Sequence, residues 1–552
     1  MNLSNYKNQK IHFLNFIDII LKYFPFILII ILCFSYLFIN KNFTAFEHNT
    51  LSFNAGLEFY DNREEIDYIT SSILESPKII IIRFVNFFFD DWYFGTYYFK
   101  VFLNLNLFLS IWFLYYSIIR YNFEYNNKVL NNKINLLIIL FFLLFYLGIF
   151  RKFHGYGGKL SPLGWGGIQY FNDFSSMLLS FVAGAYAISF SLNKKKIINF
   201  ATIILFTFST FIHPAMGVCN LILLFIFYEK NFNLNYFKNF LIFIFFSILI
   251  PIIILKIYVP EDVVISGKEF FEIYVKDRHP HHYIVSNKIL KITYPNGNLN
   301  LYSYLVWIFL LSFLSLFSFI FAKKILSINL LILIIFILIP ISQFIFVEKL
   351  NLKLFTELGI TRFTSCISLI FFFQIILNFL NFMETKKKIY KDNQNFSDKK
   401  KLSITKYIFL TIIISFFISK LTLIHPLNDK NFLKYQTITS WVKNNIKSDK
   451  EFFIEHEDLT FVSFLRVYGK QKIFFNEEHF PFSPNYIKKY IVRLKHQRRI
   501  RYLLKNGNYS EMIDNLNESI GYIILEVDKF NLKTDSKEII YKDEFYMIIK
   551  VY

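Results

Sequence analysis

Cysteine is scarce in this chain of 552 residues, and its scarcity removes one class of fold from consideration. The three cysteines are Cys33, Cys219 and Cys366, and each lies inside an apolar segment. Small secreted domains held by disulfides carry many cysteines at regular spacings. No disulfide framework is therefore predicted, and cysteine gives no information about the compartment.

A phosphate-binding loop is also lacking. Gly158-Lys159 lies in a Gly-rich stretch over residues 151–171, but Leu160 replaces the required Ser or Thr and the upstream glycine spacing is wrong. The glycines are interpreted as close packing of backbone in a ligand-lining loop, or as plain turn residues.

Acidic residues are outnumbered, with 40 Asp and Glu against 60 Lys and Arg and a net charge of +20. Much of the basic excess lies beside apolar segments, where it indicates orientation in a membrane and contact with lipid headgroups. No nucleic-acid partner is predicted. The first apolar run lacks a small-residue cleavage site, so no cleavable signal peptide is predicted.

What the chain has in abundance is apolar side chain: 55% of residues are hydrophobic, 21% are aromatic, and the mean hydropathy is +0.40. Several apolar runs exceed the roughly 18 residues that mark a spanning helix. We predict an all-α polytopic membrane domain with about 11 spans over residues 1–424, followed by a soluble α/β domain over 425–552. The predicted spans are 23–40, 99–119, 134–150, 172–192, two short helices within 197–228, 239–258, 305–322, 326–347, 363–382 and 407–424.

Lysine tracts predict the orientation. Residues 194–196, 323–324 and 386–406, the last with eight lysines, are expected on the cytoplasmic side. The N-terminus is then cytoplasmic, while the loops 41–98 and 259–302 and the C-terminal domain are extracytoplasmic. This orientation requires a helical hairpin turning at His213-Pro214; the alternative is one kinked helix with a buried histidine.

The C-terminal domain is predicted from a change of composition after residue 425. A helix over 433–446 and a basic helix over 485–504 accompany strands at 452–454, 473–475 and 522–525 and a hairpin over 539–551. The basic helix carries Arg493, Lys495, Arg498, Arg499 and Arg501. It is interpreted as a solvated face or as a surface for an anionic lipid or polymer.

Polar groups that suit chemistry gather in the predicted outer loops. Residues 277–283 hold three of the 11 histidines beside an arginine and an acid. Carboxylates could act as a general base or hold a divalent metal, arginines could bind phosphate, and histidines could contact substrate or metal. The candidate catalytic acids are Asp61, Glu64, Asp67, Asp90 and Asp91, and the candidate substrate-binding residues are His213, Arg278, His279, His281, His282 and Arg362. For each, a purely structural or solvated role is the alternative.

The layout resembles the C-type glycosyltransferase superfamily in its first span, its large acidic outer loop with an interfacial segment at 79–89, its many short spans and its outer C-terminal domain. More narrowly, it resembles a bacterial family of multi-pass proteins of unknown function, through Arg278-His279-Pro280-His281-His282-Tyr283, Arg362, Phe464-Leu465-Arg466 and Phe480-Pro481-Phe482. The superfamily resemblance implies sugar transfer from a polyprenyl-phosphate donor in a bacterial inner membrane, with a first-loop carboxylate as base. The sequence departs from the compact Asp-Glu or Asp-Xaa-Asp signature of that superfamily, since residues 61–67 are Asp61-Asn62-Arg63-Glu64-Glu65-Ile66-Asp67.

These observations favour an inverting transferase acting on a lipid-linked sugar. Asp67 or Asp90 is then the expected base, Arg278 and Arg362 bind the phosphate, and a divalent metal is one alternative role for the histidines and acids. Two rival classes are a transporter for a lipid-linked glycan and a non-catalytic membrane scaffold. A transporter is expected to have repeated halves and polar residues along a path through the membrane. The sequence shows neither feature, because no internal repeat is evident and the centres of the predicted spans are nearly uncharged.

Overall fold

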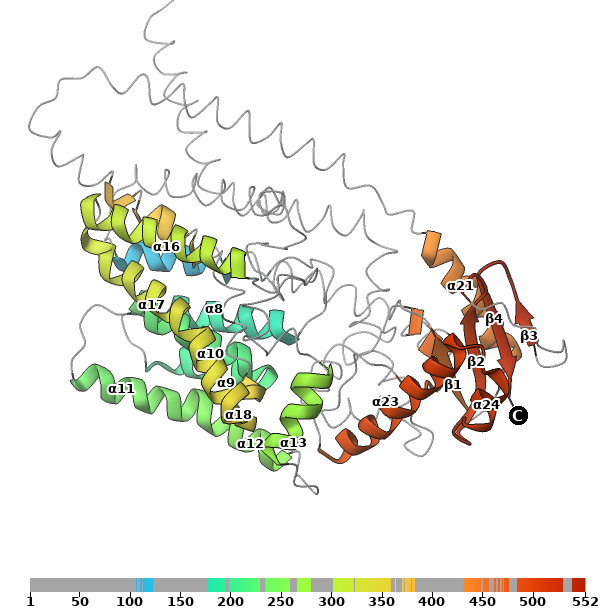
Figure 1. The fold of residues 1–552 in the computed structure, drawn as a ribbon. Helices are drawn as coiled ribbons and strands as arrows, with labels where there is room; N and C mark the ends of the chain where they lie inside the picture. Colours follow the sequence, from blue (N-terminus) through green and yellow to red (C-terminus); the bar gives the residue numbers. More distant parts are fainter. Residues whose placement is uncertain are drawn as a thin grey trace, which may run out of the picture.

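A computed structural model of the chain contains a group of apolar helices and a small mixed sheet (Figure 1). It describes residues 106, 110–111, 113–122, 176–194, 198–228, 234–258, 266–278, 301–321, 323–358, 363, 370–371, 373–378, 380–382, 430–447, 450–455, 461–462, 465–466, 469, 471–475, 484–529 and 539–551. Helix predominates among these residues. The predicted combination of a helical part with a small sheet is confirmed.

Two described helical stretches, Phe237–Leu255 and Leu326–Lys349, are long and apolar enough to cross a membrane. Shorter apolar helical stretches accompany them: Leu179–Asn193, Phe200–Ile212, Pro214–Tyr228 and Trp307–Phe321. The predicted spans at 23–40, 134–150 and 407–424 lie outside the described residues.

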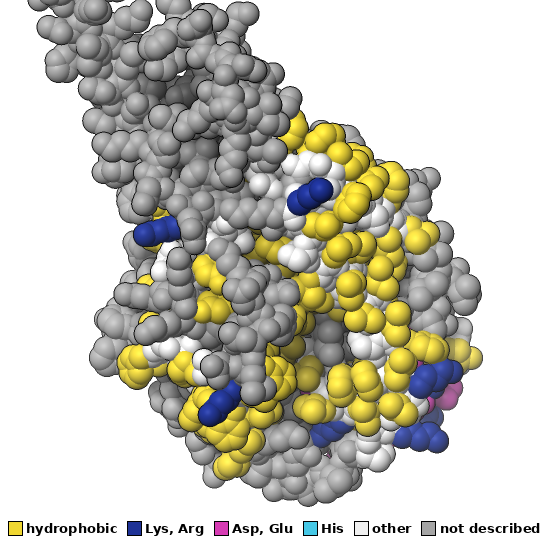
Figure 2. Space-filling model, turned by 90° about the vertical axis from the view of Figure 1, so that its left-hand side faces the viewer, with side chains coloured by type: hydrophobic (Ala, Val, Ile, Leu, Met, Phe, Trp, Pro, Cys, Tyr) yellow, Lys and Arg dark blue, Asp and Glu magenta, His cyan; other side chains and the backbone are white. Residues whose placement is uncertain are grey.

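These helices expose large apolar side chains. Only 22% and 28% of the two span-length stretches are buried within the protein. Ile257, Phe309 and Phe319 are 73%, 68% and 59% exposed, respectively. Figure 2 shows a face on which apolar side chains are widespread and Lys and Arg are scattered. Monomeric soluble proteins rarely leave so much contiguous apolar surface in water.

Helices α8 (Ser176–Lys194), α9 (Phe200–Ile212) and α10 (Pro214–Tyr228) pack in alternating directions. Hydrogen bonds pair Ser180 with Ser209 and Thr202 with the Ala187 carbonyl, so α8 and α9 are antiparallel. The amide of Asn220 donates to Ser209 Oγ at 3.0 Å, which requires α10 to fold back along α9. The predicted hairpin over 197–228 is therefore confirmed, and a single kinked helix is wrong.

The chain then continues through α11 (Leu234–Ile244), the π-helix η3 (Phe245–Leu249) and α12 (Ile250–Tyr258). Pro251 has no amide hydrogen, so it leaves a carbonyl of the preceding turn unpaired, and the backbone widens to a π-helix there. A second antiparallel pair consists of α16 (Leu301–Phe321) and α17 (Leu326–Gln343), joined by the 3₁₀ turn η5 (Lys323–Ile325). The π-helix η6 (Phe344–Lys349) extends α17, and α18 (Lys353–Leu358) follows.

Because consecutive helices reverse direction, the connections fall at two ends of the helical part (Figure 1). One end holds the α9–α10 turn, the end of α12 and the end of η6. The other end holds the η5 turn and the start of α11. The prediction of His213 on the same side as the loop after α12 agrees with this alternation.

The C-terminal part is a four-stranded sheet in the order β1-β2-β4-β3. The strands are β1 (Glu451–Glu455), β2 (Ile520–Glu526), β3 (Ile539–Lys542) and β4 (Tyr546–Lys550). β1 and β2 are parallel, and β4 is antiparallel to both β2 and β3. The predicted strand at 473–475 is reduced to one bridge between Ile473 and Phe452.

Helices α21 (Lys430–Asn445), α23 (Pro484–Lys505) and α24 (Tyr509–Asp514) accompany the sheet. α23 ends at Lys505 and is followed by Gly507, whose positive φ of 75° permits the amides of Gly507 and Asn508 to bond back to the carbonyls of Leu504 and Leu503. The β3–β4 turn is closed by Asp543, whose Oδ1 accepts from the amides of Phe545 and Tyr546 at 2.7 and 2.6 Å. Asp side chains stabilise turns in this way, which explains the hairpin predicted from the sequence.

Candidate functional site

Most of the predicted site residues lie outside the described part of the chain. This applies to Asp61, Glu64, Asp67, Asp90, Asp91, His279, His281, His282 and Arg362. The structure describes His213 with its side chain, and it describes the backbone of Arg278 as the last residue of the π-helix η4. The proposed meeting of the acids with the histidines therefore stays a prediction.

His213 forms the turn between α9 and α10. Its backbone is extended, with φ −152° and ψ 91°, and Pro214 begins the next helix. Nδ1 of His213 accepts a hydrogen bond from the amide of Met216 at 3.2 Å, so the imidazole caps α10. An accepting Nδ1 places the proton of the neutral ring on Nε2. One predicted ligand contact thus also has a structural role that its sequence position did not reveal.

The segment that leads to Arg278 is fixed at its start. It consists of α13 (Gly267–Phe270) and η4 (Phe271–Arg278), and Ser266 caps it by accepting from the Glu269 amide at 3.1 Å. Gly267 packs against the carbonyl of Asn351, at a distance that a Cβ atom would not tolerate. The turn at Asn351 has a positive φ of 49° and lies between η6 and α18. The start of the segment is therefore held against the end of a span-length helix.

Two hydrophobic clusters hold the rest of this segment, and Tyr274 packs against both of them. Phe270, 5% exposed, belongs to the core of the C-terminal part, together with residues of β1, β2 and α23. Its neighbour Phe271 and Val275 pack instead with Val347 of η6, and Phe355 of α18 adjoins them. Nζ of Lys353 lies 5.7 Å from the ring centre of Phe270. The segment thus joins the apolar helices to the C-terminal sheet.

η4 is π-helical, as η3 and η6 are elsewhere in the described part of the chain. π-helices are rare and are found often at functional sites. η4 ends at Arg278, where the Arg-His-Pro-His-His motif begins. Helix α18 contacts both η4 and α10, the helix that His213 caps. The described elements therefore connect η4, which leads to the motif, with α10 through a single short helix.

A buried polar cluster, not predicted from the sequence, lies among α8, α9 and α10. Ser180, Ser209 and Asn220 are fully buried, and Asn220 donates to the Ser180 carbonyl at 3.1 Å as well as to Ser209. Gly184 lies so close to Asn220 that an added Cβ would overlap its side chain. Small residues and interhelical amides of this kind stabilise helix pairs in lipid. In the sequence, this cluster could have been predicted from the polar residues Ser180, Ser209 and Asn220 within apolar runs.

The α16–α17 pair repeats the arrangement. Asn329 is fully buried and donates to Ser318 Oγ at 2.9 Å, with the same separation of eleven residues as Ser209 and Asn220. In both pairs the Ser–Asn hydrogen bond lies close to the interhelical turn. These clusters are best explained as packing devices, because neither contains an ionisable side chain.

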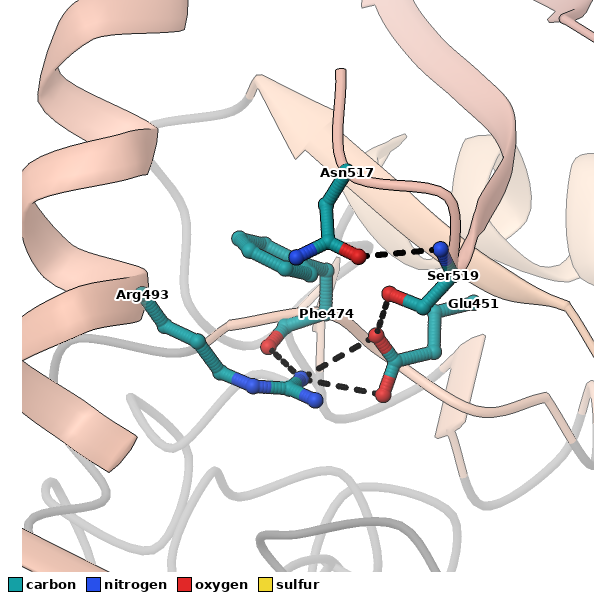
Figure 3. A network of polar contacts seen from close by, with 5 residues as sticks. All are labelled: Glu451, Phe474, Arg493, Asn517 and Ser519. Atoms are coloured by element: carbon teal, nitrogen blue, oxygen red, sulfur yellow. Dashed lines mark hydrogen bonds and ion pairs between the residues drawn. The ribbon is translucent and has the colours of Figure 1, made fainter.

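A polar network joins α23 to the sheet in the C-terminal part (Figure 3). Arg493 donates to both carboxylate oxygens of Glu451, at 2.9 and 3.1 Å, and to the Phe474 carbonyl at 2.5 Å. Ser519 Oγ donates to Glu451 Oε2 at 2.7 Å, and the Ser519 amide donates to Asn517 at 3.0 Å. Arg493 and Glu451 have side chains 20% and 10% exposed, so both charges are satisfied in a mostly buried setting.

A second ion pair follows two turns along the same helix. Arg501 donates from Nε to Glu455 Oε2 at 2.6 Å, and Glu455 lies at the other end of β1. His496, between the two arginines on α23, has its pKa lowered by burial and by the charges of Arg499 and Arg493. Two of the predicted basic residues are therefore internal partners of β1, whereas Lys495, Arg498 and Arg499 remain exposed.

The described residues contain no group of three or more His, Cys, Asp or Glu side chains that could hold a metal ion. The predicted metal alternative involves the first-loop acids and the histidines after Arg278, and those residues lie outside the described part of the chain.

Comparison with known proteins finds no matching family model and no matching curated relative for this chain.

Proposed function

We propose that this protein is a multi-pass membrane enzyme that transfers a sugar or related group from a polyprenyl-phosphate donor at the extracytoplasmic face. The observation that carries the proposal is the fixed position of η4. Phe270 and Phe271 hold this π-helix between the C-terminal sheet and the end of a span-length helix, and the Arg-His-Pro-His-His motif follows directly. Rigid support of this kind suits a residue that must position a phosphate.

Membrane insertion is supported by the exposed apolar helices and by the two span-length stretches. Lipid would cover the apolar side chains that water would not tolerate. The proposal of about 11 spans rests on the hydropathy of the sequence, and the proposal of a cytoplasmic N-terminus rests on its lysine tracts.

In the proposed reaction, a first-loop carboxylate, Asp67 or Asp90, removes the proton of an acceptor hydroxyl. The acceptor oxygen attacks the anomeric carbon of the donor sugar, and the bond from that carbon to the phosphate oxygen breaks with inversion. The electron pair leaves with polyprenyl phosphate. Arg278 and Arg362 would bind the phosphate oxygens through their guanidinium groups as negative charge develops.

His213 takes a narrower role in this scheme than its sequence position indicates. Its Nδ1 accepts from the Met216 amide, so that nitrogen serves the helix cap and is not the atom that would contact a ligand.

The test uses the full chain in lipid nanodiscs with a synthetic polyprenyl-phosphate sugar and a hydroxyl acceptor. Release of polyprenyl phosphate is the measurement. Asp67→Asn and Asp90→Asn identify the base, whose loss should lower the rate by about 10²–10⁴. Arg278→Gln should lower it by about 10² or more.

Lys276→Gln is the matched control in the same helix, because Lys276 is exposed, pairs across one turn with Glu272, and lies with Nζ 5.5 Å from the ring centre of Phe271. It should leave the rate unchanged, since surface pairs of this kind contribute little. Passage of intact donor across the bilayer without cleavage would instead establish a transporter. If the donor is neither cleaved nor transported, the result favours the non-catalytic scaffold.

A further inference from the structure

Helix α23 divides its cations between two faces. The helix contains eight Lys and Arg and no acid. Arg493 and Arg501 point to β1 and are paired with Glu451 and Glu455. Four other cations, which we call the basic strip, are exposed and form no hydrogen bond or ion pair with other residues in the described part of the chain: Lys495, Arg498, Arg499 and Lys505.

Two apolar side chains interrupt the basic strip. Val492 is 66% exposed and Tyr502 is 67% exposed. With 3.6 residues per turn, residues 492, 495, 499 and 502 lie along one face of the helix. The apolar stripe of α23 packs in the core of the C-terminal part, so Val492 and Tyr502 are additional apolar groups on the outer face. A face that presents cations together with aliphatic and aromatic side chains combines the groups that contact lipid headgroups and the membrane interface.

The local electrostatics agree with an anion-binding role. Burial, and after it the charges of Arg499 and Arg493, lower the pKa of His496 on the same helix. Glu451 and Glu455 pair with Arg493 and Arg501 on the other face of α23, so these carboxylates do not neutralise the basic strip. The basic strip therefore presents cations without a balancing acid on its own helix.

The basic strip also belongs to a unit that is joined to the apolar helices. Ile487 and Tyr490 of α23 share a hydrophobic cluster with Phe270. The next residue, Phe271, packs against the end of the span-length stretch that finishes at Lys349. Figure 1 shows α23 and α13 on the same side of the apolar helices. A bilayer surface around those helices would thus lie on the side from which α23 extends.

We infer that the basic strip of α23 binds the phosphate groups of anionic lipids at the membrane surface. The inference rests on the membrane location in the proposed function, but not on sugar transfer. Lys and Arg attract the anionic headgroups, while Val492 and Tyr502 enter the interface between headgroup and acyl chain.

The test measures the acetylation rates of individual lysines by mass spectrometry on the full chain in nanodiscs. Nanodiscs of phosphatidylcholine alone are compared with nanodiscs that also contain phosphatidylglycerol. Lys495 and Lys505 should react at least about fivefold more slowly when the anionic lipid is present, and added salt should remove the difference. Lys542 and Lys550, exposed on β3 and β4, are internal controls whose rates should not change.

A double variant, Arg498→Gln with Arg499→Gln, should abolish the protection of Lys495, whereas Lys542→Gln with Lys550→Gln should preserve it. Equal rates in the two kinds of nanodisc, or full protection in the arginine variant, would overturn the inference. Protection by soluble polyphosphate but not by phosphatidylglycerol would also overturn it, in favour of an anionic polymer. Donor cleavage, measured separately on the same samples, distinguishes failure of the basic strip from failure of the proposed transferase.

Discussion

Asn220 and Gly184 show how one buried amide determines the distance between two helices. The Asn220 side chain occupies the space in which a Cβ on residue 184 would lie, and its amide bonds to the Ser180 carbonyl and Ser209 Oγ. Glycine at position 184 is therefore required by the neighbour and not by the backbone conformation.

Gly184→Ala should lower the melting temperature of the detergent-solubilised chain, because overpacking typically costs about 1–3 kcal/mol. Asn220→Ala should also lower it, through a cavity and lost hydrogen bonds. The double variant should be more stable than the sum of the two effects, with a coupling of about 1 kcal/mol or more. Strict additivity would show that the two residues do not compete for the same space.

At the scale of the element, α23 illustrates that cations of one helix are not equivalent. Arg493 is held by Glu451 and the Phe474 carbonyl, while Arg499 is exposed. Removing Arg493 leaves a mostly buried carboxylate without its partner, and this costs far more than removing a solvated charge.

Arg493→Ala should destabilise the packing of α23 on β1 by about 2–3 kcal/mol, a value reduced for partial exposure. Arg499→Ala, six residues along the same helix, should change stability by less than about 0.5 kcal/mol. Hydrogen exchange of the β1 and β2 amides measures the change in stability of both variants. A similar loss of protection in the two variants would contradict the assigned pairing.

Helical and strand periodicity in the sequence predicted the elements of the C-terminal part well. The helix expected at 485–504 is α23 (Pro484–Lys505), and the strand expected at 522–525 is β2 (Ile520–Glu526). Periodicity reports which face is apolar, but it does not report which arginine pairs with which glutamate 42 or 46 residues away in the sequence. For that reason the basic helix was predicted while its division into two faces was not.

The candidate site was predictable to a smaller extent. His213-Pro214 was correctly identified as a turn, because proline interrupts a helix and is favoured at a first helical position. The capping bond of His213 depends on the geometry of one turn and could not be read from composition. The same holds for Phe270 and Phe271, which are adjacent in a loop predicted only as hydrophilic and yet pack in different clusters.

At the scale of the whole molecule, α13 and η4 are the described connection between the two parts. Phe270→Ala should weaken the C-terminal core by about 3 kcal/mol, the usual cost of a truncated buried Phe. Glu269→Ala on the same helix changes an exposed residue and serves as the control. Protease susceptibility of the full chain in nanodiscs, together with hydrogen exchange of α13, measures the effect. Equal behaviour of the two variants would show that Phe270 does not hold the parts together.

Adjacent phenylalanines that enter separate hydrophobic clusters have a mechanical consequence. The segment formed by α13 and η4 packs against two hydrophobic clusters, so it cannot rotate about its axis unless one of these clusters opens. The orientation of the backbone at Arg278 is therefore set jointly by the C-terminal sheet and by α18. A ligand that displaced Arg278 would then shift the packing at the C-terminal sheet, and a force on that sheet would shift the backbone at the start of the histidine-rich motif.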